Sequence, residues 1–223
     1  AWYKNQPNGG VYAGNVFYKY KGDIPENTSF VIKEGTVSIS PDAFIKENRR
    51  IDYGLVAVAI PNSVEIIGEY AFSGCSVLDS IHIPEGVSEI GERTFENCLA
   101  LRSVVLPQSI TNIRRNAFVG CTTLGTIDIP EGVKSIEEGT FGNCTSLASI
   151  TIPNSVMTIE FGAFSNTAYY NDAKNWDKGV LYISNCLIEA KTSIAGDYNI
   201  KPDTRVIADY ALSGCSNLTS VTF

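Results

Sequence analysis

Cysteine and histidine are the residue types in this chain that could carry nucleophilic, redox or metal chemistry. The 223-residue sequence contains six cysteines and one histidine, His82. A Ser-His-Asp or Cys-His arrangement needs a base beside the nucleophile and a third group that orients the base. A zinc site needs cysteines or histidines at short spacing, and the sequence contains no Cys-x-x-Cys. The spacing of these residues therefore indicates something other than a reactive centre.

Five of the six cysteines recur at one position of a sequence repeat. The first four lie 23 residues apart and the fifth takes the same slot after an interruption: Cys75, Cys98, Cys121, Cys144 and Cys215. The expected distance between cysteines of neighbouring units would by itself allow a disulfide between them. Side chains that point the same way from stacked units nevertheless suit small buried apolar residues better. We therefore expect six thiols, of which Cys186 alone lies outside the register.

The repeat is a 23-residue unit that occurs four times without insertion or deletion and begins a fifth time, with first residues Leu55, Leu78, Leu101, Leu124 and Leu147. The units share the pattern L-x-x-[IV]-x-[IL]-P-x-[GS]-[VI]-x-x-I-x-x-x-[AT]-F-x-x-C. Degenerate units flank them, through Phe30, Ile32, Ile39 and Phe44 before the array and Ile200, Ile207, Leu212, Cys215 and Leu218 after it. One unit cannot bury these apolar residues alone, whereas stacked units bury them as columns, so the pattern predicts a solenoid.

Each unit is expected to form one coil of a right-handed solenoid. The last part of the Leu-x-x-Ile-x-Ile segment alternates apolar and polar residues, as a short strand does. The proline that follows lacks an N–H and therefore ends the strand. We expect about seven coils with a parallel β-sheet on the concave face and short helical or irregular return segments. The recurrent phenylalanines should form a buried aromatic spine: Phe44, Phe72, Phe95, Phe118, Phe141 and Phe164.

The fifth unit is interrupted after Thr167. Leu218 follows Leu147 by 71 residues, and since one period takes 23 of them, 48 residues have been added. Within them, residues 169–172 and 174–179 are predicted to be loops, and residues 180–190 to form a β-hairpin that turns at Ser184 and Asn185. The N-terminal region echoes this segment, which suggests one module used twice.

We therefore predict one solenoid domain over residues 1–223. Residues 1–54 form an N-terminal cap and a degenerate first coil, and residues 55–167 form five repeats. Residues 168–199 form the hairpin insertion, and residues 200–223 resume the repeat. Because the sequence stops inside a coil at Phe223, we expect the array to be cut there rather than capped.

The charge and hydropathy of the chain limit the kinds of partner that it could bind. The formal net charge is −7 and the isoelectric point is about 4.8, so the chain lacks the basic stripe that nucleic acid or an anionic membrane surface requires. No apolar run approaches the roughly 20 residues that span a bilayer, which argues against membrane insertion. The first residues do not form a signal peptide, and we expect one to be removed or to lie outside this sequence.

The repeat L-x-x-I-x-I-P-x-G-V-x-x-I-G-x-x-A-F-x-x-C closely resembles that of the BspA-like leucine-rich-repeat family, and the segment from Trp176 to Ala211 looks like a recurring part of it. The resemblance implies a leucine-rich-repeat fold in a bacterial secreted or surface-attached protein, extracellular in location, that acts in adhesion to host proteins or to other cells. It brings no catalytic motif, and binding residues do not transfer between members. Arg114 and Arg115 depart from the repeat, as does Leu212, which replaces the spine phenylalanine.

Two surfaces are candidates for binding a partner. On the sheet, outward side chains form two columns of small residues, and the candidates there are Ser80, His82, Ser103, Val105, Thr126, Asp128, Ser149 and Thr151. In the insertion the candidates are Tyr169, Tyr170 and Trp176. Because neither neighbour of His82 in its column could orient it, and because no phosphate loop or metal motif occurs, we expect no catalytic, metal or cofactor site.

The function expected from the sequence is a non-catalytic scaffold that binds a protein of the host matrix or of a cell surface. Two alternatives stay open. The mild character of the sheet residues, which lack the large anchors of binding hot spots, favours a stalk or spacer that displays another domain. The aromatic residues of the insertion favour glycan binding.

Overall fold

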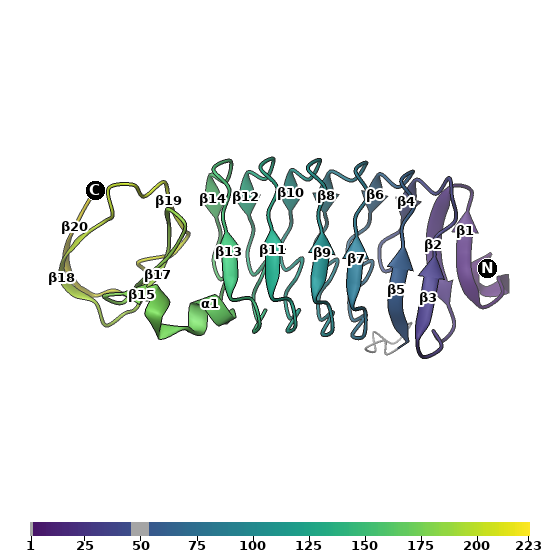
Figure 1. Ribbon diagram of the computed structural model, residues 1–223, viewed down its shortest axis with the longest axis horizontal. Coiled ribbons are helices and arrows are strands. Elements are labelled where there is room, and N and C mark those ends of the chain that lie inside the picture. Colours follow the sequence, from purple (N-terminus) through teal and green to yellow (C-terminus); the bar gives the residue numbers. More distant parts are fainter. Residues whose placement is uncertain (1, 46–53) are drawn as a thin grey trace.

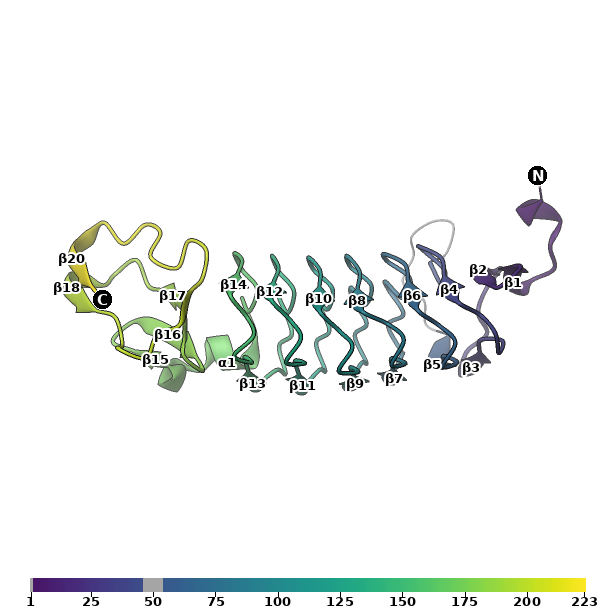
Figure 2. The same cartoon turned by 90° about the horizontal axis from the view of Figure 1, so that it is seen from above.

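The chain forms one elongated array of stacked coils in a computed structural model that describes residues 2–45 and 54–223 (Figure 1). The two ends of the chain lie at opposite ends of the array. Seen from above, the regular coils follow one another along a nearly straight line (Figure 2). The part of the predicted N-terminal segment 1–54 that comprises residues 46–53 lies outside the described residues.

The first strand of each coil joins a parallel sheet along one side of the array. In order, these strands are β3 (Thr28–Val31), β5 (Leu55–Ala59), β7 (Ser80–His82) and β9 (Ser103–Val105). The next two, β11 (Thr126–Asp128) and β13 (Ser149–Thr151), pair in the same way. Ser80 pairs with Ser103 and Thr126 with Ser149, so each register step equals one repeat. The predicted strand position in the repeat is confirmed.

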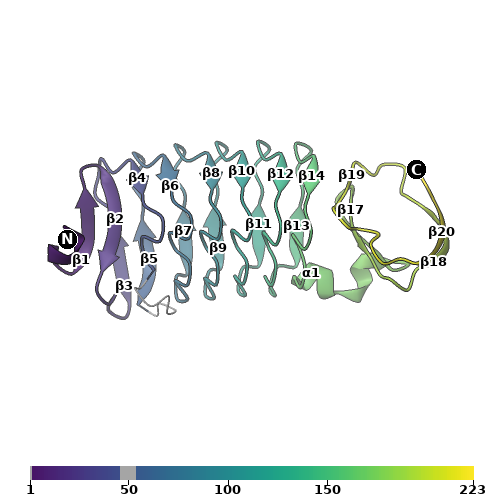
Figure 3. The ribbon, with the colours of Figure 1, turned by 180° about the vertical axis from the view of Figure 1, so that it is seen from behind.

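A second set of parallel strands, two residues long, runs along the return path (Figure 3). Seven such strands occur in the described residues: β4 (Ser38–Ile39), β6 (Ile66–Ile67), β8 (Glu89–Ile90), β10 (Asn112–Ile113), β12 (Ser135–Ile136), β14 (Thr158–Ile159) and β19 (Val206–Ile207). They agree with the predicted solenoid of about seven coils. Counting the two hairpins as further turns gives about nine.

Each of two antiparallel hairpins begins a block of coils. The first joins β1 (Gly9–Ala13) to β2 (Val16–Lys21), preceded by the short 3-10 helix η1 (Tyr3–Asn5). The second joins β16 (Val180–Ile183) to β17 (Cys186–Ala190) and confirms the predicted hairpin. In both, the second strand pairs in parallel with a return strand, β2 with β4 and β17 with β19. The last pair of strands is β18 (Ala195–Asn199) and β20 (Asn217–Thr222).

The prediction of loops before the second hairpin was wrong. Residues Ala168–Asn171 form helix α1, Ala173–Asn175 form the 3-10 helix η2, and Trp176–Asp177 form strand β15. Both short helices depend on side-chain caps: Thr167 accepts a hydrogen bond from the N–H of Tyr170, and Asp172 accepts one from the N–H of Lys174. Neither helix is long enough to show a helical period in the sequence. Among the described residues, no helix is long and apolar enough to cross a bilayer.

The core is a set of columns that run through all the coils, and the phenylalanine spine is its largest member. The ring centroids of successive spine residues lie 5.2 to 5.7 Å apart from Phe44 to Phe164, with interplanar angles between 4° and 19°. Spine side chains are at most 2% exposed. At the N-terminal end Phe17, Tyr20 and Phe30 gather around Phe44 and close the column. The predicted spine is confirmed.

Replacing Phe118 by alanine should lower the free energy of unfolding by about 3–5 kcal/mol, because the ring lies between two others and leaves a cavity that the coils cannot close. Chemical denaturation followed by circular dichroism measures the change. The matched control is Val105→Ala, since Val105 is 51% exposed on the sheet face, and it should change stability by less than about 0.5 kcal/mol. An unchanged denaturation midpoint in the Phe118 variant would rule out the stacked core.

Candidate functional site

The sheet face carries the eight candidate residues, and the structure leaves all of them exposed to solvent. Ser80, His82, Ser103, Val105, Thr126, Asp128, Ser149 and Thr151 project from β7, β9, β11 and β13, between buried residues of the same strands. Their outward direction is therefore confirmed, and their role in binding stays a prediction. In register, His82 pairs with Val105 across the sheet, which provides no group to orient an imidazole.

The cysteine column is a set of buried thiols that hold neighbouring coils together. All six cysteines are thiols rather than disulfides, as expected. The sulfur of Cys98 donates to the carbonyl oxygen of Phe72 at 3.2 Å, that of Cys121 to Phe95 at 3.1 Å, and that of Cys144 to Phe118 at 3.2 Å. Burial raises the pKa of Cys98 and Cys121 well above the ordinary range and that of Cys144 to about 12. Such thiols stay protonated and unreactive at neutral pH.

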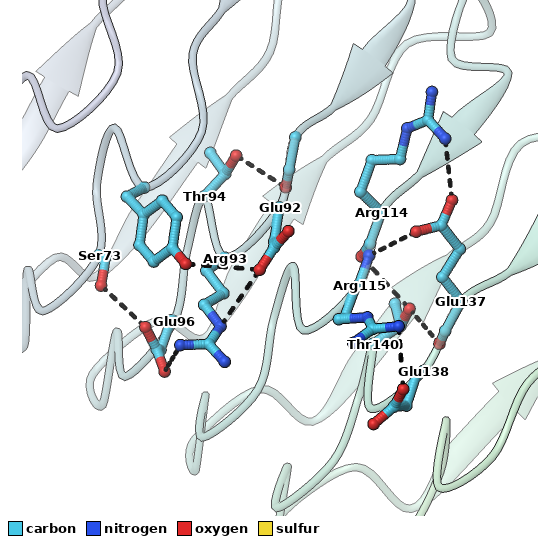
Figure 4. Close-up of polar contacts among 12 residues, drawn as sticks. Ser73, Glu92, Arg93, Thr94, Glu96, Arg114, Arg115, Glu137, Glu138 and Thr140 are labelled. Atoms are coloured by element: carbon cyan, nitrogen blue, oxygen red, sulfur yellow. Dashed lines mark hydrogen bonds and ion pairs between the residues drawn. The ribbon is translucent and has the colours of Figure 1, made fainter.

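The return path carries ion pairs between neighbouring coils (Figure 4). Arg114 bridges three coils, because its guanidinium contacts Glu89 at 2.8 Å and Glu137 at 3.0 Å. Arg115 pairs with Glu138 at 3.1 Å. The two arginines that depart from the repeat thus link their coil to both neighbours. Among the described residues, no group of three metal-ligating side chains occurs, on this face or elsewhere.

The three aromatic candidates of the insertion are half-buried and bonded to other parts of the chain. Tyr169 donates its hydroxyl to the carbonyl of Tyr182 at 3.1 Å, and Tyr170 donates to the carboxylate of Glu189 at 2.8 Å. The pKa of Tyr170 is raised to about 12, mainly by burial and then by Glu189. Trp176 donates its indole N–H to the carbonyl of Tyr170 at 2.6 Å.

The Trp176 ring also packs against two side chains of the insertion. The rings of Tyr170 and Trp176 meet edge to face with their centroids 5.2 Å apart, and the ammonium group of Lys191 lies over the Trp176 ring, 4.9 Å from its centroid. A ring that stacks on a sugar needs an open face. The insertion aromatics therefore pack the insertion together instead of forming a flat platform.

A groove that the sequence did not predict lies where the regular coils meet the insertion. Its volume is about 770 Å³, within the range of ligand sites. One wall is the turn 160–165 of the last regular coil, and the others are residues 188–193 and residues 208–210 with Ser213 and Tyr170. The exposed rings of Phe161 and Tyr210 meet edge to face at its border, with centroids 5.9 Å apart. Periodicity could not reveal this groove, because it exists where the period breaks.

Arg205 clamps the insertion block to the last regular coil at a second, smaller pocket, which Pro153, Asn154, Ser184 and Asn185 also line. Its guanidinium donates to the carbonyl oxygens of Pro153 and Asn154, both at 3.1 Å, and to that of Val156. It also lies 3.6 Å from the sulfur of Cys186, the cysteine outside the register. Beyond this clamp, the N–H of Asp209 donates to the carbonyl of Ile159 at 2.8 Å. These contacts fix the groove's walls relative to each other.

Comparison with protein families gives one match. The family described as "BspA type Leucine rich repeat region" matches residues 37–171 in six copies. No curated protein matches the chain.

Solved structures with the same fold come from several bacteria. A leucine rich cell surface protein from Faecalibacterium prausnitzii A2-165 is 23% identical with a TM-score of 0.65, over 99% of this chain and 77% of that one. A leucine-rich repeat protein from Bacteroides ovatus is 24% identical with a TM-score of 0.52, over 87% and 68%. One from Eubacterium ventriosum is 24% identical with a TM-score of 0.52, over 74% and 50%. At these identities the similarity shows the solenoid fold.

The buried thiols predict a loss of stability in alkali. The pKa of Cys144 rises from about 9 to about 12 on folding, so its stabilising effect is complete below pH 9. Between pH 9 and pH 12 the unfolded chain ionises first, and the free energy of unfolding should fall. Urea denaturation across this range should show a shallower decline for Cys144→Ala than for the parent chain. Identical slopes would contradict a buried thiol at this position.

Removing the clamp should loosen the junction. Arg205→Met deletes hydrogen bonds from a charged donor to three carbonyls, and we expect the free energy of unfolding to fall by about 1–3 kcal/mol. The matched control is Arg102→Met, because Arg102 makes one exposed ion pair with Asp79 at 3.2 Å, and its loss should cost less than about 1 kcal/mol. Thermal denaturation of both variants measures the loss of stability. Equal losses in the two variants would mean that Arg205 does not hold the insertion block to the last regular coil.

Proposed function

We propose that this chain, which belongs to the BspA-type leucine-rich-repeat family because that family's pattern covers residues 37–171, is a non-catalytic scaffold that binds a protein partner. The partner is a protein of the host matrix or of a cell surface. The observation that carries the proposal is the long exposed face of β7, β9, β11 and β13, whose outward residues are small and uncharged apart from Asp128. A face of this kind offers area and shape without reactive groups.

An enzyme requires a nucleophile, a base and a group that orients the base. The buried cysteines have raised pKa values and donate to backbone carbonyls, so they are poor nucleophiles. The histidine faces solvent beside an apolar neighbour. These features support a binding protein over a catalyst.

The proposed location is the cell surface or the extracellular space of a bacterium. The Faecalibacterium protein with the same fold is described as a leucine rich cell surface protein, which supports this location. All six cysteines are buried free thiols, so the fold does not depend on disulfides, which would need an oxidising compartment to form. The fold is therefore compatible with export without disulfide formation.

A spacer that displays another domain is the second candidate. The straight course of the regular coils favours it (Figure 2), as does the absence of large aromatic anchors among the sheet candidates. Glycan binding through the insertion has less support, since the ring of Trp176 is covered by Tyr170 and Lys191.

Surface plasmon resonance tests the proposal with the full chain immobilised and purified extracellular-matrix proteins, as well as detergent-free membrane vesicles from host cells, as analytes. We expect saturable binding to a protein component with a Kd of about 10 μM or lower. Protease treatment of the vesicles should abolish that binding, because the partner is a protein.

Two matched substitutions locate the surface. Thr126→Arg places a large charged side chain on the sheet face, and Thr158→Arg does the same on β14 of the return path; both threonines are exposed. If the sheet face binds, only Thr126→Arg should weaken binding, by about tenfold or more. If no matrix protein or vesicle binds up to about 100 μM, the spacer function replaces this proposal.

A further inference from the structure

Backbone hydrogen bonds between the turns of successive coils follow one rule. Within each regular coil, three N–H groups at alternate residues donate to carbonyls 22 residues further along the chain. In one coil the donors are Asn116, Phe118 and Gly120, with distances of 2.9 Å each. In the next coil they are Gly139, Phe141 and Asn143, at 3.2, 2.8 and 2.9 Å. Each turn therefore offers donors to the coil that follows and acceptors to the coil that precedes.

The last regular coil keeps its donors but has no following coil of the same kind. By the period of 23, the corresponding N–H groups are those of Gly162, Phe164 and Asn166. The carbonyls of this turn are used, because Phe161, Ala163 and Ser165 accept the bonds from the previous coil. Among the hydrogen bonds made by the described residues, none is donated by these three N–H groups.

The insertion explains why the donors lack acceptors. The hairpin supplies the forward N–H donor to the next turn, because the N–H of Ala190 donates to the carbonyl of Ala211 at 2.7 Å, while that turn's link to the last regular coil runs the other way, from the N–H of Asp209 to the carbonyl of Ile159. The same arrangement opens the array, where the N–H of Tyr20 donates to the carbonyl of Ala43 at 2.8 Å. The turn 160–165 and the hairpin thus face each other across the groove, and Gly162 and Phe164 line it.

The charges around the groove select among the groups that could accept these hydrogen bonds. Its lining includes three carboxylates, those of Glu160, Glu189 and Asp209, and one ammonium group, that of Lys191. The ammonium group lies over the ring of Trp176. An anionic ligand would suit the N–H donors but would meet net negative charge. A neutral carbonyl acceptor flanked by cationic groups satisfies both requirements.

The groove also has an apolar component. Phe161 and Tyr210 are 59% and 72% exposed although their rings are in contact. Both residues line the groove. Exposed apolar side chains gathered at one junction indicate a place where another chain packs.

From these observations we infer that the junction groove binds a basic polypeptide segment of the partner. The segment's backbone carbonyls, at alternate residues, accept hydrogen bonds from the N–H groups of Gly162, Phe164 and Asn166, as a following coil would. Its lysine or arginine side chains face Glu160, Glu189 and Asp209, and an apolar side chain packs on Phe161 and Tyr210. This is edge pairing of the kind that adds a strand to a sheet. The inference rests on the proposed protein-binding function, adds the junction groove as a second contact surface beside the sheet face, and names the chemistry of the segment that binds there.

Hydrogen exchange of backbone amides, followed by NMR on the full chain, tests the inference directly. In the unliganded chain, the amides of Gly162, Phe164 and Asn166 should exchange at least about tenfold faster than those of Gly139, Phe141 and Asn143, which are bonded. Equal protection of the two sets would overturn the inference, because the donors would then have partners within the chain.

The probe for binding is a blocked peptide of alternating lysine and valine, compared with the same peptide carrying glutamate in place of lysine. The lysine peptide should bind at least about tenfold more tightly and should slow exchange at the three amides about tenfold. Equal affinities, or binding that leaves these amides unprotected, would overturn the inference. If the partner still binds on the sensor surface, the broader function stands.

Two double variants separate the groove from general charge. Glu189→Gln with Asp209→Asn should weaken the lysine peptide about threefold to tenfold, whereas Glu65→Gln with Glu85→Gln removes the same charge from exposed sites elsewhere and should leave its Kd within about twofold. Phe161→Ala should weaken binding without changing its dependence on salt.

Two outcomes would assign the groove to another occupant and would refute a basic peptide. If neutral tri-N-acetylglucosamine protects the three amides, the groove binds a saccharide. If raising the protein concentration alone protects them, the groove binds a second copy of the chain.

Discussion

Pairing between successive coils is the interaction on which the rest of this structure depends. A coil of 23 residues has no interior of its own, so its leucine, isoleucine and phenylalanine side chains are buried only when a neighbour with the same spacing covers them. The backbone imposes the same condition. The turns of the four coils that begin at Leu55, Leu78, Leu101 and Leu124 each donate three N–H groups to the turn that follows, and an unpaired buried group would cost free energy. Side-chain columns and backbone ladder therefore require one constant period, and the sequence keeps it without a gap from Leu55 to Thr167.

The cysteine position shows how one residue serves this pairing and how its replacement ends it. In three successive coils the thiol donates to the carbonyl of the spine phenylalanine in the coil before, as Cys98 does to Phe72, Cys121 to Phe95 and Cys144 to Phe118. Thr167 occupies this slot in the last coil and is fully buried. Its hydroxyl instead accepts from the N–H of Tyr170 and caps helix α1. A side-chain oxygen favours a helix N-terminus, where a thiol does not. The change from cysteine to threonine thus coincides with the place where the chain leaves the repeat.

The sequence predicted those features that repeat and missed those that occur once. Period and apolar spacing were sufficient to place the strands, the phenylalanine spine and the thiols, because each position is decided by its copies in neighbouring coils. The helices α1 and η2 were assigned to loops, since their stability comes from the caps at Thr167 and Asp172 and not from a pattern. The pairing of Arg114 with Glu89 and Glu137 was also missed. These residues lie 25 and 23 positions apart, so only the stacked fold brings them together.

The junction groove follows from the stacking of the coils, but the repeat pattern in the sequence did not predict it. The turn of a regular coil has two different sides: its preceding side presents carbonyls and its following side presents N–H groups. A hairpin that restarts the array pairs with the coils after it, as β2 does with β4 and β17 with β19, and leaves the donors of the coil before it in place. The interruption therefore produces a directional edge with defined spacing inside the array. Because Glu189 comes from the hairpin and Glu160 from the last regular coil, the charge that selects the acceptor also arises only when the two blocks meet. We propose that specificity arises at this break in the period, where the two blocks meet, while the regular coils supply the frame of the array.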